Sequence, residues 1–167
     1  TVAATGDRAI LTLQAGAFSA NGEADGKPEV IELSSASVSQ LQLVGYEKAE
    51  AGGVDLTKAE VIVSAGRGVG KPENVSMVAD LAKALGGEYG ASRPVVDAQW
   101  VEHNRQVGTT GMTVAPKLYI ACGISGAVQH LAGMKQSDFV VAVNTDRDAP
   151  INEVADVFVV ADLKQFL

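Results

Sequence analysis

The stretch VIVSAGRGVGKPENVSMVADLAKALGG, residues 61–87, decides the fold class. It opens with a run of apolar and β-branched residues, typical of a buried strand, which we expect to end at Ser64 or Ala65. Three glycines follow, and Pro72 then suits the first turn of a helix that Gly86 is expected to close. Apolar residues recur along this helix at helical spacing, namely Val78, Leu81, Ala82 and Leu85. The stretch therefore predicts a strand–turn–helix unit of a parallel sheet.

Short apolar runs alternate with helical patterns along the rest of the chain. Several runs are apolar at consecutive positions, as in strands that are buried on both faces. We predict an α/β fold of three layers, doubly wound, with a mostly parallel sheet covered by helices on both faces. The predicted strands are residues 9–14, 30–35, 41–46, 60–66, 87–92, 117–123, 139–144 and 157–162, and residues 15–29 are predicted to form a connector.

Length and composition limit the class of protein. The 167 residues fit one domain, and the 47% hydrophobic and 20% charged content is ordinary for a soluble globular protein. No apolar run approaches the roughly 20 residues that span a bilayer. The net charge is −7, and nine acidic residues against four Lys and Arg place most of the acidic excess in residues 1–60. Because a nucleic-acid partner requires a basic surface with aromatic platforms, we expect none.

The number and spacing of cysteine and histidine residues do not indicate a disulfide bond, a metal site or a hydrolytic triad. The single cysteine, Cys122, excludes an internal disulfide bond and is predicted to pack within a strand. The two histidines, His103 and His130, lack partners at zinc-ligand spacing, so we expect no metal site. No GxSxG motif is present, and a hydrolytic triad is therefore poorly supported.

The glycine-rich turn at residues 66–70 has two interpretations. Its backbone N–H groups and the following helix could bind a phosphate, or the glycines could serve only a tight turn. The spacing GxGxG differs from the dinucleotide motif GxGxxG, and Lys71 is not followed by Ser or Thr as in a Walker motif.

A second junction carries another candidate site. Arg93 is expected at the end of a strand, where α/β proteins hold their ligands, with Pro94 keeping it out of a helical conformation. The later loop QVGTTG, residues 106–111, offers hydroxyl and N–H groups to a ligand. It is equally an ordinary connector whose hydroxyls bind the local backbone.

The segment GISGAVQHLAGM, residues 123–134, is predicted to begin a helix with Ser125 as its N-cap. At about 100° per residue, one face carries Ala127, Val128, Leu131 and Ala132 and faces the sheet. The other face carries Ser125, Gly126, Gln129 and His130. It is suited to an electron-rich ligand and equally to solvent.

The long stretch LYIACGISGAVQHLAGMKQSDFVVAVNTDRDAPINEVADVFVVADL, residues 118–163, resembles the FAD-binding region of the electron transfer flavoprotein alpha (large) subunit. Upstream, GRG, GASRPVVDA and QVGTTG stand in the order of that family. The resemblance runs from about Glu60 to the C-terminus, and more weakly back to residues 9–18.

The resemblance implies FAD, bound without a covalent link, in a deoxyhypusine-synthase-like NAD/FAD-binding domain. It places Arg93 over the isoalloxazine ring, Thr110 near N5 and His130 near the N1/C2 edge, where a guanidinium and an imidazole donor stabilise the charge of a reduced flavin. Thr109 stands where many relatives carry Gln, and it is assigned no side-chain contact. Further cofactor-binding residues implied by the family are Arg67, Ser92, Gln106, Val107, Gly108, Gly111, Ser125, Gly126 and Gln129 around the ring, ribityl chain and pyrophosphate, with Asn144, Asp162 and Leu163 toward the adenosine.

The implied function is electron transfer without substrate chemistry of its own. The implied partners are a beta subunit, flavoprotein dehydrogenases as donors and a membrane quinone reductase as acceptor. Residues 1–167 are expected to be one FAD-binding domain cut from a larger subunit, with the main flavin-binding region at 61–167. We expect it in the cytoplasm of a bacterium or in the mitochondrial matrix.

Two alternatives to this function remain. One is a nicotinamide-dinucleotide-binding domain of similar fold. The other is a docking module without its own cofactor, with the acidic residues 1–60 as the partner surface.

Overall fold

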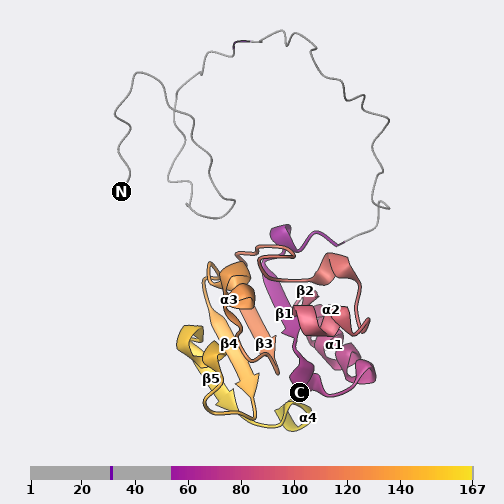
Figure 1. The fold of residues 1–167 in the computed structure, drawn as a ribbon, viewed down its shortest axis with the longest axis vertical. Coiled ribbons are helices and arrows are strands. Elements are labelled where there is room, and N and C mark those ends of the chain that lie inside the picture. Colours follow the sequence, from indigo (N-terminus) through magenta and orange to yellow (C-terminus); the bar gives the residue numbers. More distant parts are fainter. Residues whose placement is uncertain (1–30, 32–53, 167) are drawn as a thin grey trace.

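The computed structural model describes Ile31 and residues 54–166 (Figure 1). The strands predicted at 9–14, 30–35 and 41–46 lie outside the described residues, apart from Ile31, and so does the connector at 15–29. Within the described part of the chain, no helix has the length and apolar character that crossing a bilayer requires.

The described residues form a five-stranded sheet in the order β2-β1-β3-β4-β5, in which every pairing is parallel (Figure 1). Ala65 lies opposite both Ala91 and Cys122, and Cys122 lies opposite Val143, so the carboxyl ends of four strands meet at one edge. The strands are β1 (Val61–Ala65), β2 (Glu88–Ala91), β3 (Leu118–Cys122), β4 (Val140–Asn144) and β5 (Val157–Val160). The five strands predicted from residue 60 onward are confirmed.

Two apolar clusters lie on the two faces of this sheet, because alternate strand residues point to opposite sides. Ile62 and Tyr119 belong to the cluster that includes Met134 of α3 (Val128–Met134). Val63 and Ile120 belong to the other, with residues of α1 (Val75–Ala84) and α4 (Leu163–Phe166). This arrangement confirms the predicted three-layer α/β fold. The remaining elements are α2 (Arg93–Asp97) and the 3-10 helices Leu56–Lys58, Arg67–Val69, Pro72–Asn74, His103–Arg105 and Pro150–Val154.

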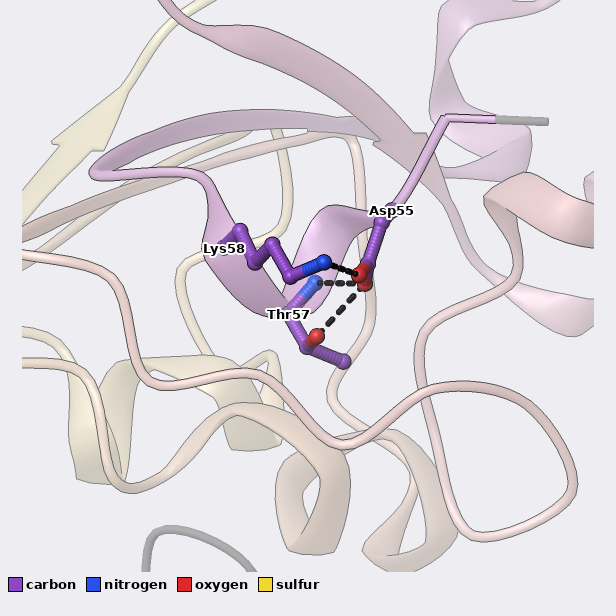
Figure 2. Close-up of polar contacts among 3 residues, drawn as sticks. All are labelled: Asp55, Thr57 and Lys58. Atoms are coloured by element: carbon purple, nitrogen blue, oxygen red, sulfur yellow. Dashed lines mark hydrogen bonds and ion pairs between the residues drawn. The ribbon is translucent and has the colours of Figure 1, made fainter. Parts of the chain in front are cut away.

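A capped turn leads the chain into β1. Asp55 accepts hydrogen bonds from the backbone N–H and the hydroxyl of Thr57, and its carboxylate pairs with Lys58 (Figure 2). The hydroxyl and ammonium partners lower the pKa of Asp55 below its usual value. Leu56, within this turn, is fully buried. The turn therefore anchors the start of the described domain to the core.

The helix predicted after the glycine turn is α1, and it ends as expected. Gly86 has φ +69°, and its N–H donates to the carbonyl of Lys83. Leu85, however, is 43% exposed, so its assignment to the apolar stripe is wrong. The helix ends at Ala84, and Leu85 has already left the helical geometry that carries the stripe onto the sheet.

The expected conformation of Arg93 is also wrong, because Arg93 is the first residue of α2. Pro94 occupies the first turn of this helix, where its missing N–H needs no partner. The avoidance of helix before proline is a bias, and here the start of a helix overrides it.

Helix α3 begins at Val128 with Ala127 as its N-cap, two residues later than a cap at Ser125 predicts. Gly126 has φ +91°, a left-handed conformation, and a Cβ there would overlap the backbone nitrogen of Ile151. The carbonyl of Ser125 accepts the N–H of Ile151 (3.0 Å), so the backbone at this point is held by a contact outside the helix, and Gly126 is not helical. As a result the predicted faces are wrong at four residues, since Ala127 and Val128 are exposed and Gly126 and His130 are buried.

Candidate functional site

A cavity of about 480 Å³ lies at the carboxyl edge of the sheet, within the size range of small-molecule sites. It spans the ends of β1 and β3, the neighbouring strands between which the strand order reverses, and such a switch point is the usual ligand site of open α/β sheets. The residues that line it are Arg67, Gly68, Ser92, Arg93, Pro94, Val107, Gly108, Thr109, Thr110, Gly123, Ile124, Ser125, Ala127, Gln129, His130, Asn144 and Asp146.

The glycine turn after β1 serves close packing. The N–H of Gly66 donates to the carbonyl of Cys122 (2.8 Å) and that of Gly68 to the carbonyl of Gly123 (2.9 Å). A Cβ on Gly66 would overlap the Gly123 carbonyl, and one on Gly68 would lie 2.7 Å from the Gly123 Cα. These N–H groups are therefore used within the protein, which favours the tight-turn interpretation over a backbone phosphate cradle. The side chain of Arg67 is what this turn offers to the cavity.

The two cavity arginines are held differently. The guanidinium carbon of Arg67 lies 4.8 Å from the centroid of the Trp100 ring. Arg93 Nε lies 3.3 Å from Asp97 Oδ2, and both of these side chains are about two-thirds exposed, at 65% and 63%. An exposed pair of this kind contributes little free energy, so Arg93 can exchange Asp97 for an anionic ligand.

His130 is buried in the cavity wall, where it connects strand β3 to the loop at residues 106–112. Its Nδ1 lies 3.1 Å from the carbonyl oxygen of Val107, and its Nε2 lies 2.9 Å from the hydroxyl of Tyr119. Because a carbonyl only accepts, Nδ1 carries the proton, and the Tyr119 hydroxyl donates to Nε2. Burial lowers the pKa of His130 to about 4 and raises the pKa of Tyr119, so both groups are neutral near pH 7.

Both ring nitrogens of His130 are thus occupied by protein groups. The ring lines the cavity but has no N–H left to donate into it while the Tyr119 contact holds. The resemblance implies a donor to the flavin edge at this position, and that role stays a prediction.

The loop at residues 106–112 lies directly against α3. The N–H of Thr109 donates to the carbonyl of Gln129 (3.0 Å), and a Cβ on Gly133 would lie 2.5 Å from both Cα and N of Gly108. Within the loop, the buried Gln106 donates from Nε2 to the hydroxyl oxygen of Thr110 (2.9 Å). The loop is therefore held by contacts with α3 and by a side-chain hydrogen bond of its own, and it forms a wall of the cavity.

Most of the residues that the resemblance implies line the cavity, and five do not. Asp162 accepts the N–H of Lys164 at the start of α4, and Leu163 is buried in the core. Gln106, Gly111 and Gly126 do not line the cavity, although Gln106 donates a hydrogen bond to the lining residue Thr110. Their cofactor contacts stay predictions.

Some lining residues were missed from the sequence, including Gly123, Ile124 and Asp146. Gly123 and Ile124 directly follow β3, so the rule that ligands lie at strand ends was the signal for them. Thr109, to which no side-chain contact was assigned, lines the cavity together with Thr110, and whether its side chain contacts the cofactor stays a prediction.

Comparison with known proteins gives the family. Residues 55–135 match the family model described as the electron transfer flavoprotein FAD-binding domain. The chain is 45% identical over 166 residues to electron transfer flavoprotein subunit alpha of Bradyrhizobium diazoefficiens. The aligned residues make up 99% of this chain and 53% of that protein. The chain belongs to the electron transfer flavoprotein alpha-subunit family.

Other alpha subunits agree with this membership. That of Thermoanaerobacterium thermosaccharolyticum is 56% identical over 110 residues, which are 66% of this chain and 33% of the relative. That of Mycobacterium leprae is 46% identical over 162 residues, which are 96% of this chain and 51% of the relative. The chain thus spans between a third and about half of the length of these alpha subunits.

The family match confirms FAD as the cofactor of this electron transfer flavoprotein domain. The cavity has the groups that FAD requires. Val107, Pro94 and Ile124 offer apolar surface for a flat ring, and the guanidinium groups of Arg67 and Arg93 offer positive charge to a pyrophosphate and to a reduced ring. The N–H groups of Ser125 and Ala127, which line the cavity, have no acceptor among the described residues.

Proposed function

We propose that this chain binds FAD in the cavity at the carboxyl edge of its sheet and carries electrons as part of a larger two-subunit flavoprotein. The electrons come from flavoprotein dehydrogenases and pass to a membrane quinone reductase. The observation that supports this most directly is the coincidence of the FAD-binding family match with a cavity at the switch point between β1 and β3.

In this proposal FAD supplies the redox chemistry, and the protein binds and orients it. Arg67 and the N–H groups before α3 bind the pyrophosphate. Arg93, at the start of α2, places positive charge where an added electron is stabilised. The loop at residues 106–112 excludes water from one side of the cavity.

The residues lining the cavity support an electron carrier without substrate chemistry of its own. Among them, His130 has both ring nitrogens engaged, and Asp146 accepts the N–H of Asp148. The lining set contains no lysine, cysteine or glutamate. The histidine of this set is thus not free to act on a substrate as a general acid or base while these contacts hold.

The partners belong to the same proposal. The relatives are named as alpha subunits, which favours a beta subunit as the permanent partner. The compartment we propose is the bacterial cytoplasm or the mitochondrial matrix.

The visible absorption spectrum of the chain, purified without denaturation and after addition of FAD and gel filtration, tests the proposal. We expect flavin bands at close to one FAD per chain. A colourless protein that binds NADP but not added FAD would support the nicotinamide alternative. A chain that binds neither cofactor would support the docking module, and both of these results would overturn the proposal.

A further inference from the structure

In the part of the chain that the structure describes, Arg67 is the cavity arginine that makes no ion pair with a carboxylate. The ion pairs of arginine there join Arg93 to Asp97 and Arg105 to Glu88. Its neighbour is the indole ring of Trp100, with the guanidinium carbon 4.8 Å from the ring centroid. Such a contact holds a cation by the electron-rich face of the ring and leaves its charge in place, whereas a carboxylate would cancel it.

The backbone fixes where this indole ring lies. Helix α2 ends with Gln99 in a left-handed conformation, at φ 59°. The N–H of Gln99 donates to Val96 (2.8 Å) and that of Trp100 to Val95 (3.1 Å), the two bonds of a Schellman helix end. The Trp100 ring is partly buried and packs against the apolar cluster on the α1 side of the sheet. Trp100 is therefore held both by its backbone and by its packing.

The turn that carries Arg67 cannot bind an anion through its glycines. The N–H groups of Gly66, Gly68, Val69 and Gly70 all donate to protein carbonyls. The positive charge at the end of β1 is therefore that of the Arg67 side chain alone. A long arginine side chain without support would lose rotamer freedom on binding a ligand, which weakens affinity.

We propose that Trp100 is a positioning residue that holds the unpaired guanidinium of Arg67 at the cavity wall for the phosphate groups of the bound dinucleotide. This inference rests on the proposed function, because it takes the ligand to be FAD. In this proposal α2 has two roles. Its first residue is Arg93, and the Trp100 ring that follows its end is the surface against which Arg67 lies.

A double-mutant cycle on the full chain tests the inference, with the dissociation constant for FAD measured by titration calorimetry. We expect Trp100→Leu to weaken FAD binding roughly three- to fivefold, and Trp100→Phe, which keeps an aromatic face, to weaken it less. In the R67Q background, Trp100→Leu is expected to change the affinity by less than about twofold. Equal weakening in both backgrounds, or no weakening in either, would overturn the inference, since a purely structural tryptophan acts regardless of Arg67.

A second measurement needs no change at Trp100. This is the only tryptophan of the chain, so its fluorescence reports directly on the contact. We expect Arg67→Gln to change the wavelength or the intensity of the Trp100 fluorescence in the chain without ligand. Arg147→Gln, which changes an exposed arginine outside the cavity lining, is expected to leave the fluorescence unchanged. Identical emission of the Arg67→Gln variant and the parent would contradict the contact.

The two tests also separate this inference from the proposed function. If the parent chain binds no FAD, the proposed function fails, and the fluorescence comparison still decides whether Arg67 lies on Trp100. If Trp100→Leu does not fold, Trp100→Met takes its place in the cycle, because methionine fills irregular gaps and lacks a ring.

Discussion

His130 joins three separate parts of the fold through one imidazole ring. It belongs to α3, contacts the hydroxyl of Tyr119 on β3, and donates to the carbonyl of Val107 in the loop. The neutral ring satisfies this arrangement as it stands, since a second ring proton would require the Tyr119 hydroxyl to turn its own proton away, and burial disfavours the charged ring. The stability of the domain is therefore coupled to the charge of this residue.

The free energy of unfolding is expected to fall when the solution is acidified through the range in which His130 titrates. Its pKa is about 4 in the folded chain and 6.5 in the unfolded chain, so the unfolded chain binds more protons between these values. The contribution of His130 to the free energy of unfolding is then fully present above about pH 6.5, and the free energy of unfolding decreases by roughly 3 kcal/mol as the pH falls to 4. Urea titrations across this range measure the effect.

The control for this prediction is the other histidine. His103 is exposed, and His103→Gln should leave the pH dependence as it is in the parent chain. His130→Gln should remove the steep part of the dependence while lowering stability at every pH. An unchanged slope in His130→Gln would assign the pH dependence to carboxyl groups.

Arg93 is expected to influence the reduction potential of the bound flavin. We expect Arg93→Gln to lower the flavin reduction potential by on the order of tens of millivolts, because a positive charge is lost where negative charge develops. FAD affinity should change less, since the oxidised ring is neutral. Spectroelectrochemical titration measures the potential, with Arg147→Gln as the matched control outside the cavity lining. Equal potentials in Arg93→Gln and the parent would exclude this role.

Among the elements, α3 depends most on a single small residue. An alanine in place of glycine ordinarily stabilises a helix by up to about 1 kcal/mol. At Gly133 the added methyl group would lie 2.5 Å from the backbone of Gly108. The contact between helix and loop therefore reverses the usual sign.

We expect Gly133→Ala to destabilise the domain by roughly 1–3 kcal/mol, as in an overpacked core, and to weaken FAD binding by displacing the loop. Thermal unfolding and calorimetry measure the two effects. Gly86→Ala is the comparison, because no atom lies within 4 Å of its Cβ position, although its φ of +69° strains an alanine. If Gly133→Ala destabilises with FAD affinity intact, the loop adjusts without moving the cavity wall.

The sequence predicts most elements here because their signals are local. β1, β3 and β4 are short runs of mostly apolar residues buried from both sides, and their length and β-branched content favour strands over buried helices. Gly86 ends α1 by its own conformational freedom. The start of α3 is not set by local signals, because Ser125 is a plausible cap, but its carbonyl accepts the N–H of Ile151, which is distant in sequence.

The same distinction holds for the cavity. The family resemblance finds Arg67, Arg93 and Thr110, which do line it. It does not reveal that the N–H groups of the turn glycines donate to the carbonyls of Cys122 and Gly123. Nor does it reveal that the hydroxyl of Tyr119 is hydrogen-bonded to Nε2 of His130. Those facts depend on neighbours that are distant in sequence, so no motif contains them.

At the scale of the whole molecule, the cavity draws on segments from Arg67 to Asp146. A ligand that touches all of them binds the folded chain and not the unfolded one. We expect FAD at about 100 times its dissociation constant to raise the free energy of unfolding by roughly 2.7 kcal/mol. Urea titrations with and without FAD test this, with riboflavin as the control that lacks the phosphates. Equal stabilisation by both compounds would show that the phosphates contribute nothing.

The parallel pairing of all described strands has a consequence for how the chain acquires its fold. Parallel neighbours cannot form as a hairpin, and the central pair, β1 and β3, is separated by about 50 residues that include β2, α1 and α2. The middle of the sheet therefore closes only after a long loop has been ordered. During synthesis, β1 leaves the ribosome well before its inner partner exists, and its apolar residues stay uncovered on that side for several seconds. For this domain the order of synthesis, and not only its final contacts, sets the risk of aggregation.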